Sequence, residues 1–444
     1  MFEVDSQAKR RSLQAAIVIL GLVVRIVAVA VWNENLSQDR DSYLALALGL
    51  SEGRGYSSPG TTQPTAYRPP LYPMILALGS GAGSERYVAI LNVLLGTATV
   101  GLTFLLARRL NLAVSAAGLA AGIVAIDPLL VRYTSFPMTE TLSTFLTTGL
   151  LLWTVRLIQA GDHQSKSALL IAGLLFGLNV LCRPTLWAFG ALMVIYLFFP
   201  DGRSRSQHTG TPNGTRPMAR RLLHAWPVAL GILACVLPWT ARNWNRLGQP
   251  IVTTTHGGYT LLLGNNPAFY REVVAQPLGT VWDGSHGPGQ AVWAESINVE
   301  LQRAGLDAEV ARDRWMSRRA RRNMAKEPVL FARACLLRLI RFWNIMPSGE
   351  AAGAVPPLIR WGVGGFYSLL LPLAAVGAVL SLRRRDSRML PLLLLIASFT
   401  LVHLFYWSNV RMRAPLMPAV AIMAASTLVR SRGATSIAPD DPAR

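Results

Sequence analysis

The chain has 444 residues, 52% of them hydrophobic, and a mean hydropathy of +0.35. Because this is too apolar for an ordinary soluble protein of that length, we predict a polytopic membrane protein. The net charge of +20 would indicate nucleic-acid binding in a soluble chain, but most of it lies in loops beside apolar runs and argues against that class. The three cysteines are scattered without a CxxC pair, so we expect no disulfide, zinc or redox site.

Apolar runs long enough to cross a bilayer recur along the chain, since a span needs about 20 such residues. They predict an all-α fold with about ten transmembrane helices, within a range of about eight to eleven. The runs are 13–32, 86–107, 112–131, 139–158, 167–181, 185–199, 222–240, 358–382, 390–406 and 414–429. The first run lacks a small-residue cleavage site, so we expect it to remain as a span. The short pair that meets at Arg183 is alternatively one re-entrant hairpin.

The distribution of Lys and Arg predicts how these spans are oriented. Both are more frequent in the segments assigned to the cytoplasm than in the short outer segments. This positive-inside bias predicts a multi-pass protein of the inner (cytoplasmic) membrane with both termini cytoplasmic. The expected parts are an N-terminal membrane module with a first outer loop, an outer loop domain, C-terminal helices and a cytoplasmic tail. They cover residues 1–240 with the loop at 33–85, then 241–357, 358–430 and 431–444.

Two hydrophilic stretches differ in what they predict. Residues 201–221 have the composition of a disordered cytoplasmic linker. The outer loop domain begins irregularly, rich in Gly and Asn, with a short strand expected at 260–263. From residue 292 its pattern is helical, and Pro328 separates two helices. The second helix, 328–343, is expected to be amphipathic, to lie on the membrane surface and to lead into the next span. The amphipathic helices before and after Pro328 are candidates for the rim of a lipid groove.

The first outer loop carries the residues with the clearest chemical meaning. Asp39 and Asp41 follow the first span directly, and 42–51 reads as a helix parallel to the membrane. Residues 65–73 form a segment stiffened by prolines that carries Arg68. A carboxylate beside a guanidinium suits a reaction that removes a proton from one substrate and stabilises an anionic leaving group on another. The alternative is that these acidic side chains are merely solvated.

Further charged side chains fall at the same predicted outer surface. Glu140 opens the fourth span, where it is either a functional residue or simply part of the helix start. The arginines of this surface are Arg183, Arg242, Arg411 and Arg413. Arginine suits multidentate recognition of phosphate, and the alternative for each is an interfacial side chain that contacts lipid headgroups. Their joint occurrence on one side favours an anion site. His256 and His403 are too isolated for a metal site, so we expect hydrogen-bonding roles.

The order of these motifs resembles the GT-C superfamily of integral-membrane glycosyltransferases, and most of all the bacterial branch related to protein O-mannosyltransferases and aminoarabinose transferases. The resemblance runs from about Arg25 to Pro418. The motifs are an acidic residue four positions before Tyr43, YRPPLYP at 67–73, Glu140, RPT at 183–185, GGY and GNNP within 257–267, and VRMRAPLMP at 410–418.

The resemblance implies transfer of a sugar, with inversion, from a polyprenyl-phosphate donor to an acceptor at the outer face of the membrane. The acceptor class (lipid, glycan or protein) stays open, as does a divalent metal. The family's aspartate acts as base or positions the acceptor; it falls on Asp39, and Asp41 is an extra carboxylate that leaves the assignment between the two. The arginines Arg68, Arg242, Arg411 and Arg413 would hold the departing polyprenyl phosphate. The matched motifs also offer, as substrate-binding candidates, Tyr43, Tyr67, Arg183, Tyr259, Asn265 and Asn266.

A second function, a transporter or flippase for a lipid-linked sugar, would share the arginines and the lipid groove. It predicts charges near the bilayer midplane, inverted repeats and broken helices. In this sequence the charges gather instead at one interface, which favours an enzyme.

Overall fold

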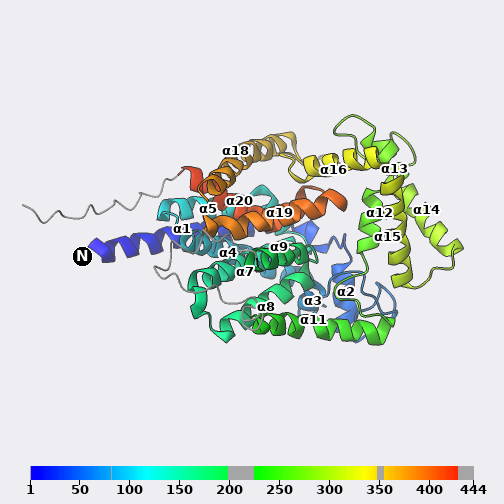
Figure 1. The fold of residues 1–444 in the computed structure, drawn as a ribbon, viewed down its shortest axis with the longest axis horizontal. Coiled ribbons are helices and arrows are strands. Elements are labelled where there is room, and N and C mark those ends of the chain that lie inside the picture. The colour runs from blue at the N-terminus through cyan, green and yellow to red at the C-terminus, as the bar shows by residue number, and fades with distance from the viewer. Residues whose placement is uncertain (1, 82, 199–224, 348–354, 429–444) are drawn as a thin grey trace, which may run out of the picture.

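The computed structural model describes residues 2–81, 83–198, 225–347 and 355–428 (Figure 1). Within these ranges the regular structure is helical, apart from one isolated antiparallel bridge between Ser57 and Pro64. The predicted all-α class is therefore confirmed, and the chain is a polytopic all-α membrane protein. The predicted linker at 201–221 and the tail at 431–444 lie outside the described residues. The proposed division into modules stays a prediction.

Each predicted membrane run corresponds to a helix. These helices are α1 (Phe2–Val31), α4 (Ser84–Arg109), α5 (Val114–Ile126) with α6 (Pro128–Tyr133), α7 (Thr139–Ala160), α8 (Lys166–Cys182), α9 (Leu186–Phe198), α11 (Trp226–Leu247), α18 (Pro357–Arg383), α19 (Leu390–Phe405) and α20 (Met417–Leu428). In the described ranges, 5 helices are long and apolar enough to cross a membrane by themselves, in α1, α4, α7, α18 and α19, and α5, α8 and α9 contain shorter apolar helices. The number of spans stays a prediction.

The bundle packs closely enough to bury polar groups inside it. Helix α1 lies against α4 and α5, α4 against α7, and α8 against α11. At the α8–α11 crossing Gly173 faces Gly231, and a Cβ on either would collide with the partner backbone. Arg25 of α1 is 1% exposed and donates to the carbonyl oxygens of Val124 and Ala125, both at 3.3 Å. A charged side chain within an apolar span is costly in hydrocarbon, and here the interior of the bundle takes it up.

The first outer loop folds as two short helices joined by an irregular segment. They are α2 (Tyr43–Ser51), which confirms the predicted helix, and α3 (Leu71–Ala77). The two pack on each other, and the rings of Tyr43 and Tyr72 meet edge to face with centroids 5.4 Å apart. Prolines at 69 and 70 disfavour helix in the residues before them, so α3 begins only at residue 71. Residues 65–68 are therefore extended or bent chain, held by contacts to other segments.

The long outer loop forms its own helical layer. Its helices are α12 (Gly257–Gly264), α13 (Pro267–Phe269), the π-helical turn η3 (Tyr270–Val274), α14 (Gly289–Arg303), α15 (Glu309–Lys326) and α16 (Pro328–Phe342). The predicted break at Pro328 is confirmed. The expected strand at 260–263 is wrong, because these residues belong to α12. Tertiary packing explains the difference: α12 lies against α15, and its leucines enter a hydrophobic cluster shared with α14, α15 and α16.

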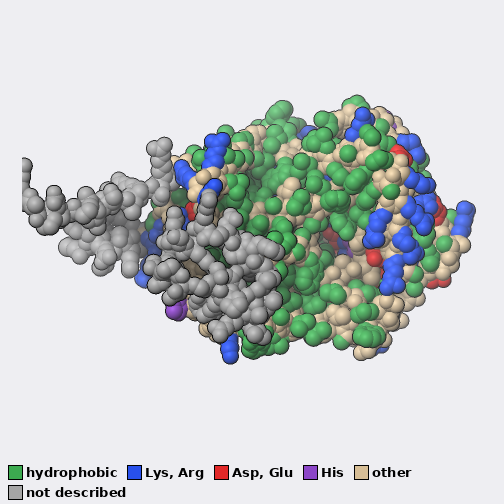
Figure 2. Space-filling model, viewed as in Figure 1, with side chains coloured by type: hydrophobic (Ala, Val, Ile, Leu, Met, Phe, Trp, Pro, Cys, Tyr) green, Lys and Arg blue, Asp and Glu red, His purple; other side chains and the backbone are tan. Residues whose placement is uncertain are grey.

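The outer helices stand at one end of the bundle, and α2 and α3 lie on the same side (Figure 1). On the face shown in Figure 2, hydrophobic side chains cover most of the middle of the molecule, and charged side chains gather over the outer helices. An apolar belt beside a charged end is the arrangement expected of a protein that sits in a bilayer with this end in the aqueous or headgroup region.

Candidate active site

Two arginines that are far apart in the chain meet at Asp41. Arg68 Nη2 lies 3.0 Å from Oδ1, and Arg411 Nη1 lies 3.0 Å from Oδ2. Burial by itself would raise the pKa of the Asp41 carboxyl, but Arg411 and Arg68 outweigh it and lower that pKa below its usual value. Asp41 is therefore an ionised, largely enclosed carboxylate with one guanidinium on each oxygen.

Arg411 connects this carboxylate to a second one. Glu140, in the first turn of α7, is 1% exposed, and its Oε1 accepts a hydrogen bond of 3.0 Å from Arg183 Nη2. Arg411 Nε lies 3.9 Å from the same oxygen. The contact arises because the 3-10 turn η5 (Val410–Leu416) packs against α7. We refer to Asp41, Arg68, Glu140, Arg183 and Arg411 as the carboxylate–arginine network.

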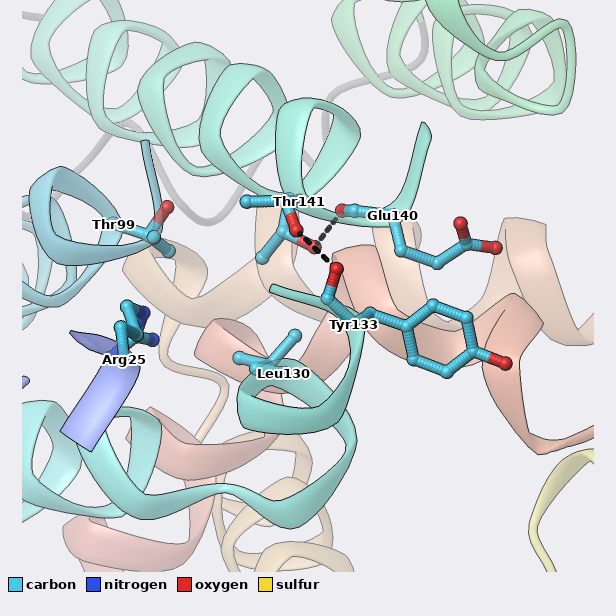
Figure 3. A pocket seen from close by; sticks show the side chains of 8 residues that line it. Arg25, Thr99, Leu130, Tyr133, Glu140 and Thr141 are labelled. Carbon is cyan, nitrogen blue, oxygen red and sulfur yellow. Dashed lines mark hydrogen bonds between the residues drawn. The ribbon is translucent and has the colours of Figure 1, made fainter. Parts of the chain in front are cut away.

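Figure 3 shows which way Glu140 points. Its carboxylate and the ring of Tyr133 extend to the same side, whereas Arg25 lies on the other side of Thr141 and Leu130. The cavity between these groups has a volume of only about 10 Å³, about the least that can hold a single water. Arg25 is therefore a buried structural residue of the bundle, and Glu140 is directed toward the arginines of the network.

The network retains hydrogen-bonding capacity that the protein does not use. Among the described residues, the buried atoms without a hydrogen-bond partner include Arg68 Nε, Arg183 Nη1, Arg411 Nε and Glu140 Oε2. Buried polar groups are normally paired, and several unpaired ones in one place need an explanation. Three guanidinium groups with free donors around a pair of carboxylates are suited to bind an oxyanion and a hydroxyl together.

The imidazole of His256 and the rings of two tyrosines border the network. His256 Nε2 lies 3.3 Å from Arg68 Nη1, so the imidazole nitrogen accepts, because a guanidinium can only donate. Burial, and then the charge of Arg68, lower the pKa of His256 from 6.5 to about 3, which keeps the ring neutral. Its Nδ1 has no partner. The rings of Tyr67 and Tyr259 flank the imidazole at centroid distances of 4.4 and 5.4 Å. The sequence had indicated only a hydrogen-bonding role for His256. Its position just before the GGY motif could have indicated that it lies at the site.

Asp39 occupies a different position from Asp41. Its two oxygens accept the backbone N–H groups of Leu44 at 3.0 Å and Ala45 at 2.8 Å, so the carboxylate satisfies donors at the start of α2. Asp39 therefore fixes the start of the helix that follows it. Of the two aspartates, Asp41 is the one placed among the arginines. Tyr43, in the first turn of that helix, is buried with its ring 5.8 Å from the Arg68 guanidinium.

Three other residues expected to contact substrate make hydrogen bonds within the protein instead. Arg242 donates to the carbonyl oxygens of Thr65, at 2.7 Å, and Tyr56. Asn265 is fully buried; its amide donates to two carbonyl groups, and its Oδ1 accepts from a tyrosine and an arginine. Asn266 caps α13 through its Oδ1 and donates to carbonyl groups at the end of α12. These contacts give all three a structural position. Both asparagine amides are paired within the protein, which differs from the substrate contacts that the resemblance implied.

Arg413 is likewise separated from the network, although it is two residues from Arg411. It is 1% exposed and donates to the carbonyl oxygens of Phe342, at 3.2 Å, and Asn344, at 2.6 Å. Its guanidinium also lies 4.3 Å from the ring centroid of Tyr367. The resemblance implied that Arg413 holds the departing phosphate together with Arg411, but in the structure Arg413 joins the end of α16 to the bundle.

Known proteins resemble the chain in sequence and in fold. The family model for dolichyl-phosphate-mannose-protein mannosyltransferases matches residues 67–241. The oligosaccharyltransferase of Archaeoglobus fulgidus, solved in its apo form, is similar with 16% identity and a TM-score of 0.53, over 94% of this chain and 50% of that one. The archaeal oligosaccharyltransferase AglB from the same organism, solved with an inhibitory peptide and a dolichol-phosphate, is similar with 15% identity and a TM-score of 0.51, over 95% of this chain and 50% of that one. No curated protein matched.

These matches show a shared fold across nearly the whole chain. The chain has the GT-C fold. The GT-C fold that the ordered motifs indicated is thereby confirmed. This chain spans about half the length of the oligosaccharyltransferases that it matches. Similarity was also found to ArnT from Cupriavidus metallidurans bound to undecaprenyl phosphate, with 16% identity over 94% of this chain and 77% of that one and a TM-score of 0.39.

In this protein of GT-C fold a groove of about 460 Å³ adjoins the first outer loop. Pro70 lines it, as does Tyr56, whose hydroxyl donates to the carbonyl oxygens of Arg68 and Pro69. The rest of the lining comes from the first outer loop, α8 and α11; it is Leu50, Gly53, Arg54, Gly55, Thr62, Pro64, Met74, Leu181, Cys235, Pro238, Trp239, Arg242 and Arg246. This groove is thus not bordered by the helices that flank Pro328, where the sequence had placed a rim. It combines an apolar wall with three arginines.

The described residues of this protein include no group of three or more His, Cys, Asp or Glu side chains placed to bind one metal ion. No residues are therefore assigned to the divalent metal that the sequence resemblance leaves open.

Proposed function

We propose that this GT-C protein is a glycosyltransferase that moves a sugar, with inversion, from a polyprenyl-phosphate donor to an acceptor at the outer face of the inner membrane. The observation that carries the proposal is the carboxylate–arginine network with its unpaired buried donors. Support also comes from the shared fold with AglB, which was solved with a dolichol-phosphate, and from the match to the mannosyltransferase family model.

The proposed division of labour follows from the geometry. Arg68 and Arg411 would bind the phosphate of the donor, while Arg183 and Glu140 hold Arg411 in place. Asp41 would accept the proton of the acceptor hydroxyl or amine as that group attacks the anomeric carbon and the polyprenyl phosphate departs. In one displacement the new bond forms on the face opposite the leaving phosphate, which inverts the anomeric centre.

The resting state makes Asp41 a weak base because two guanidinium groups stabilise its charge. Donor binding is expected to change that balance, since the phosphate competes for the same two arginines. The pKa of Asp41 should then rise from its lowered value when the donor is in place. Base strength would develop only in the loaded enzyme.

The surroundings offer places for the other parts of the donor. The groove beside Tyr56 and Trp239 is apolar along α8 and α11 and carries arginines, as a polyprenyl chain with an anionic headgroup requires. The aromatic faces of Tyr67 and Tyr259, next to the neutral His256, suit packing against a sugar ring, while the free Nδ1 of the imidazole suits a hydroxyl.

Orientation in the membrane is a further part of the proposal. The positive-inside bias predicts that residues 51–84 and 241–357 lie outside and that both termini lie in the cytoplasm. A single cysteine introduced at Gly284, in the outer loop, should react with a membrane-impermeant maleimide in intact cells, after the natural cysteines are replaced. A cysteine at Gly210, in the predicted cytoplasmic linker, should react only after lysis. The reverse pattern would contradict the proposed orientation.

The activity is tested with the purified full chain in proteoliposomes. Cells that lack the protein should accumulate the lipid-linked sugar that serves as donor, and that lipid should support transfer in vitro to an acceptor extract from the same cells. Release of free polyprenyl phosphate in step with glycosylated acceptor is the expected result. Movement of the lipid-linked sugar between leaflets without any transfer would instead establish a flippase.

A further inference from the structure

One carboxylate of the outer helical layer grips the first outer loop at the residues before Arg68. Glu309, at the start of α15, accepts from the Thr65 hydroxyl at 2.5 Å and from the Ala66 N–H at 2.9 Å. It also accepts from the Thr255 hydroxyl. The three donors belong to two segments that are distant in sequence, so one side chain joins both of them to α15.

The two segments are also bonded to each other. The Thr255 N–H donates to the Ala66 carbonyl at 3.0 Å, and the Thr254 hydroxyl donates to the Tyr67 carbonyl. From the other side, Arg242 of α11 donates to the Thr65 carbonyl at 2.7 Å. Residues 65–67 are thus held between the membrane bundle and the outer layer, with Glu309 as the acidic anchor.

The position of this anchor relates it to the proposed site. Segment 65–67 leads directly into Arg68, and Thr255 leads directly into His256. The side chains of Arg68 and His256 touch each other at 3.3 Å. Glu309 itself touches neither of them, so any influence on the network passes through the backbone of the two segments.

A carboxylate is the side chain that this junction requires. Three donors converge on its two oxygens. One of the donors is a backbone N–H, which can only donate and therefore needs an acceptor. A hydrocarbon side chain would leave all three without an acceptor, and the extended 65–67 backbone has no helix to hold it in their absence. Glutamine offers one carbonyl oxygen and one NH2 group, and a threonine hydroxyl can accept a hydrogen bond from that NH2 group. Glutamine can therefore restore most of the hydrogen bonds of the junction.

We propose that Glu309 is a positioning residue that fixes Arg68 and His256 in the geometry required for donor binding and transfer. The inference rests on the proposed function for its catalytic part and on the described contacts for its structural part. It gives the outer layer an indirect role in the site, because α15 sets the position of the arginine that meets Asp41.

The test compares Glu309→Ala with Glu309→Gln and with a matched control, Glu300→Ala. Glu300 lies on α14 of the same layer and makes only an exposed ion pair of 3.6 Å with Arg319. Hydrogen–deuterium exchange should become faster in peptides that cover 65–68 and 254–256 in Glu309→Ala, and should be unchanged in the control. Glu309→Gln should show intermediate or near-normal exchange.

Two functional measurements accompany the exchange. Thermal shift with a short-chain polyprenyl phosphate should report weaker binding in Glu309→Ala. Steady-state transfer should show a raised KM for the donor and a kcat lowered by roughly 10- to 100-fold, the scale expected when a contact residue is misplaced by about 1 Å. Glu309→Gln should restore most of both values.

The outcomes separate the two proposals. Unchanged exchange in Glu309→Ala would overturn the anchor, and faster exchange with normal ligand binding and kinetics would overturn the positioning role. If the wild-type protein binds the polyprenyl phosphate but transfers no sugar, the proposed function fails. Exchange and ligand binding in the three variants would still decide the role of Glu309.

Discussion

Asp41→Asn is expected to lower the turnover of sugar transfer by roughly 10²- to 10⁴-fold, the usual effect of losing a general base. Asn keeps the size of the side chain and one acceptor oxygen, but it cannot take a proton from the acceptor substrate. Donor binding should survive or become tighter, because Arg68 and Arg411 lose a competing carboxylate. The measurement is the rate of transfer from a polyprenyl-phosphate sugar in proteoliposomes at saturating donor.

Asp39→Asn is the matched control, since it makes the same chemical change two residues away. Its oxygens accept backbone N–H groups of α2, so the substitution should reduce stability by about 1 kcal/mol with little effect on turnover. Thermal unfolding and transfer rate are measured on the same preparations. If Asp39→Asn loses turnover while Asp41→Asn keeps it, the base lies at residue 39, and the assignment proposed for Asp41 fails.

The second large effect is expected at Arg411. Arg411→Met removes the group that lies between Asp41 and Glu140, which leaves two carboxylates without their shared cation and removes a ligand of the departing phosphate. Turnover should fall by roughly 10²- to 10³-fold, as for the loss of one oxyanion-stabilising donor, and the KM for the donor should rise. Arg411→Lys should recover only part, because an ammonium cannot serve both carboxylates in the planar way of a guanidinium.

Arg413→Met provides the contrast within the same sequence motif. Its guanidinium serves the carbonyl oxygens of Phe342 and Asn344, so its loss should lower stability by about 1 to 3 kcal/mol. The folded fraction should transfer sugar with a near-normal KM for the donor. A variant with full stability and a strongly raised donor KM would place Arg413 in the donor site after all.

The sequence was sufficient to locate the helices and to bring most of the network together. Helices were predictable because an apolar run of membrane length leaves the backbone few other ways to satisfy its hydrogen bonds. Glu140, Arg183 and Arg411 were found because charged groups at the ends of apolar runs are costly enough to need a reason. Their common side of the membrane followed from topology, which the distribution of arginine indicates.

Residues whose roles depend on distant partners could not be assigned in this way. The local sequence does not indicate that Asp39 accepts hydrogen bonds from the backbone of α2, whereas Asp41, two residues later, contacts Arg411. The leucines after Tyr259 look like a short strand until α15 is placed against them. Glu309 reads as an ordinary acidic residue at a helix start, since its partners lie 54 and 244 positions away.

The pair formed by Asp41 and Arg411 also bears on biogenesis. These residues are 370 positions apart, so the ribosome has produced most of the chain before the second of them exists. Membrane proteins emerge from the N-terminus onward, and early segments fold before late ones. A nascent chain can insert its first helices and export its first outer loop, but it cannot assemble the network until the C-terminal residues arrive. Competence for chemistry would therefore be among the last properties that the protein acquires during its synthesis.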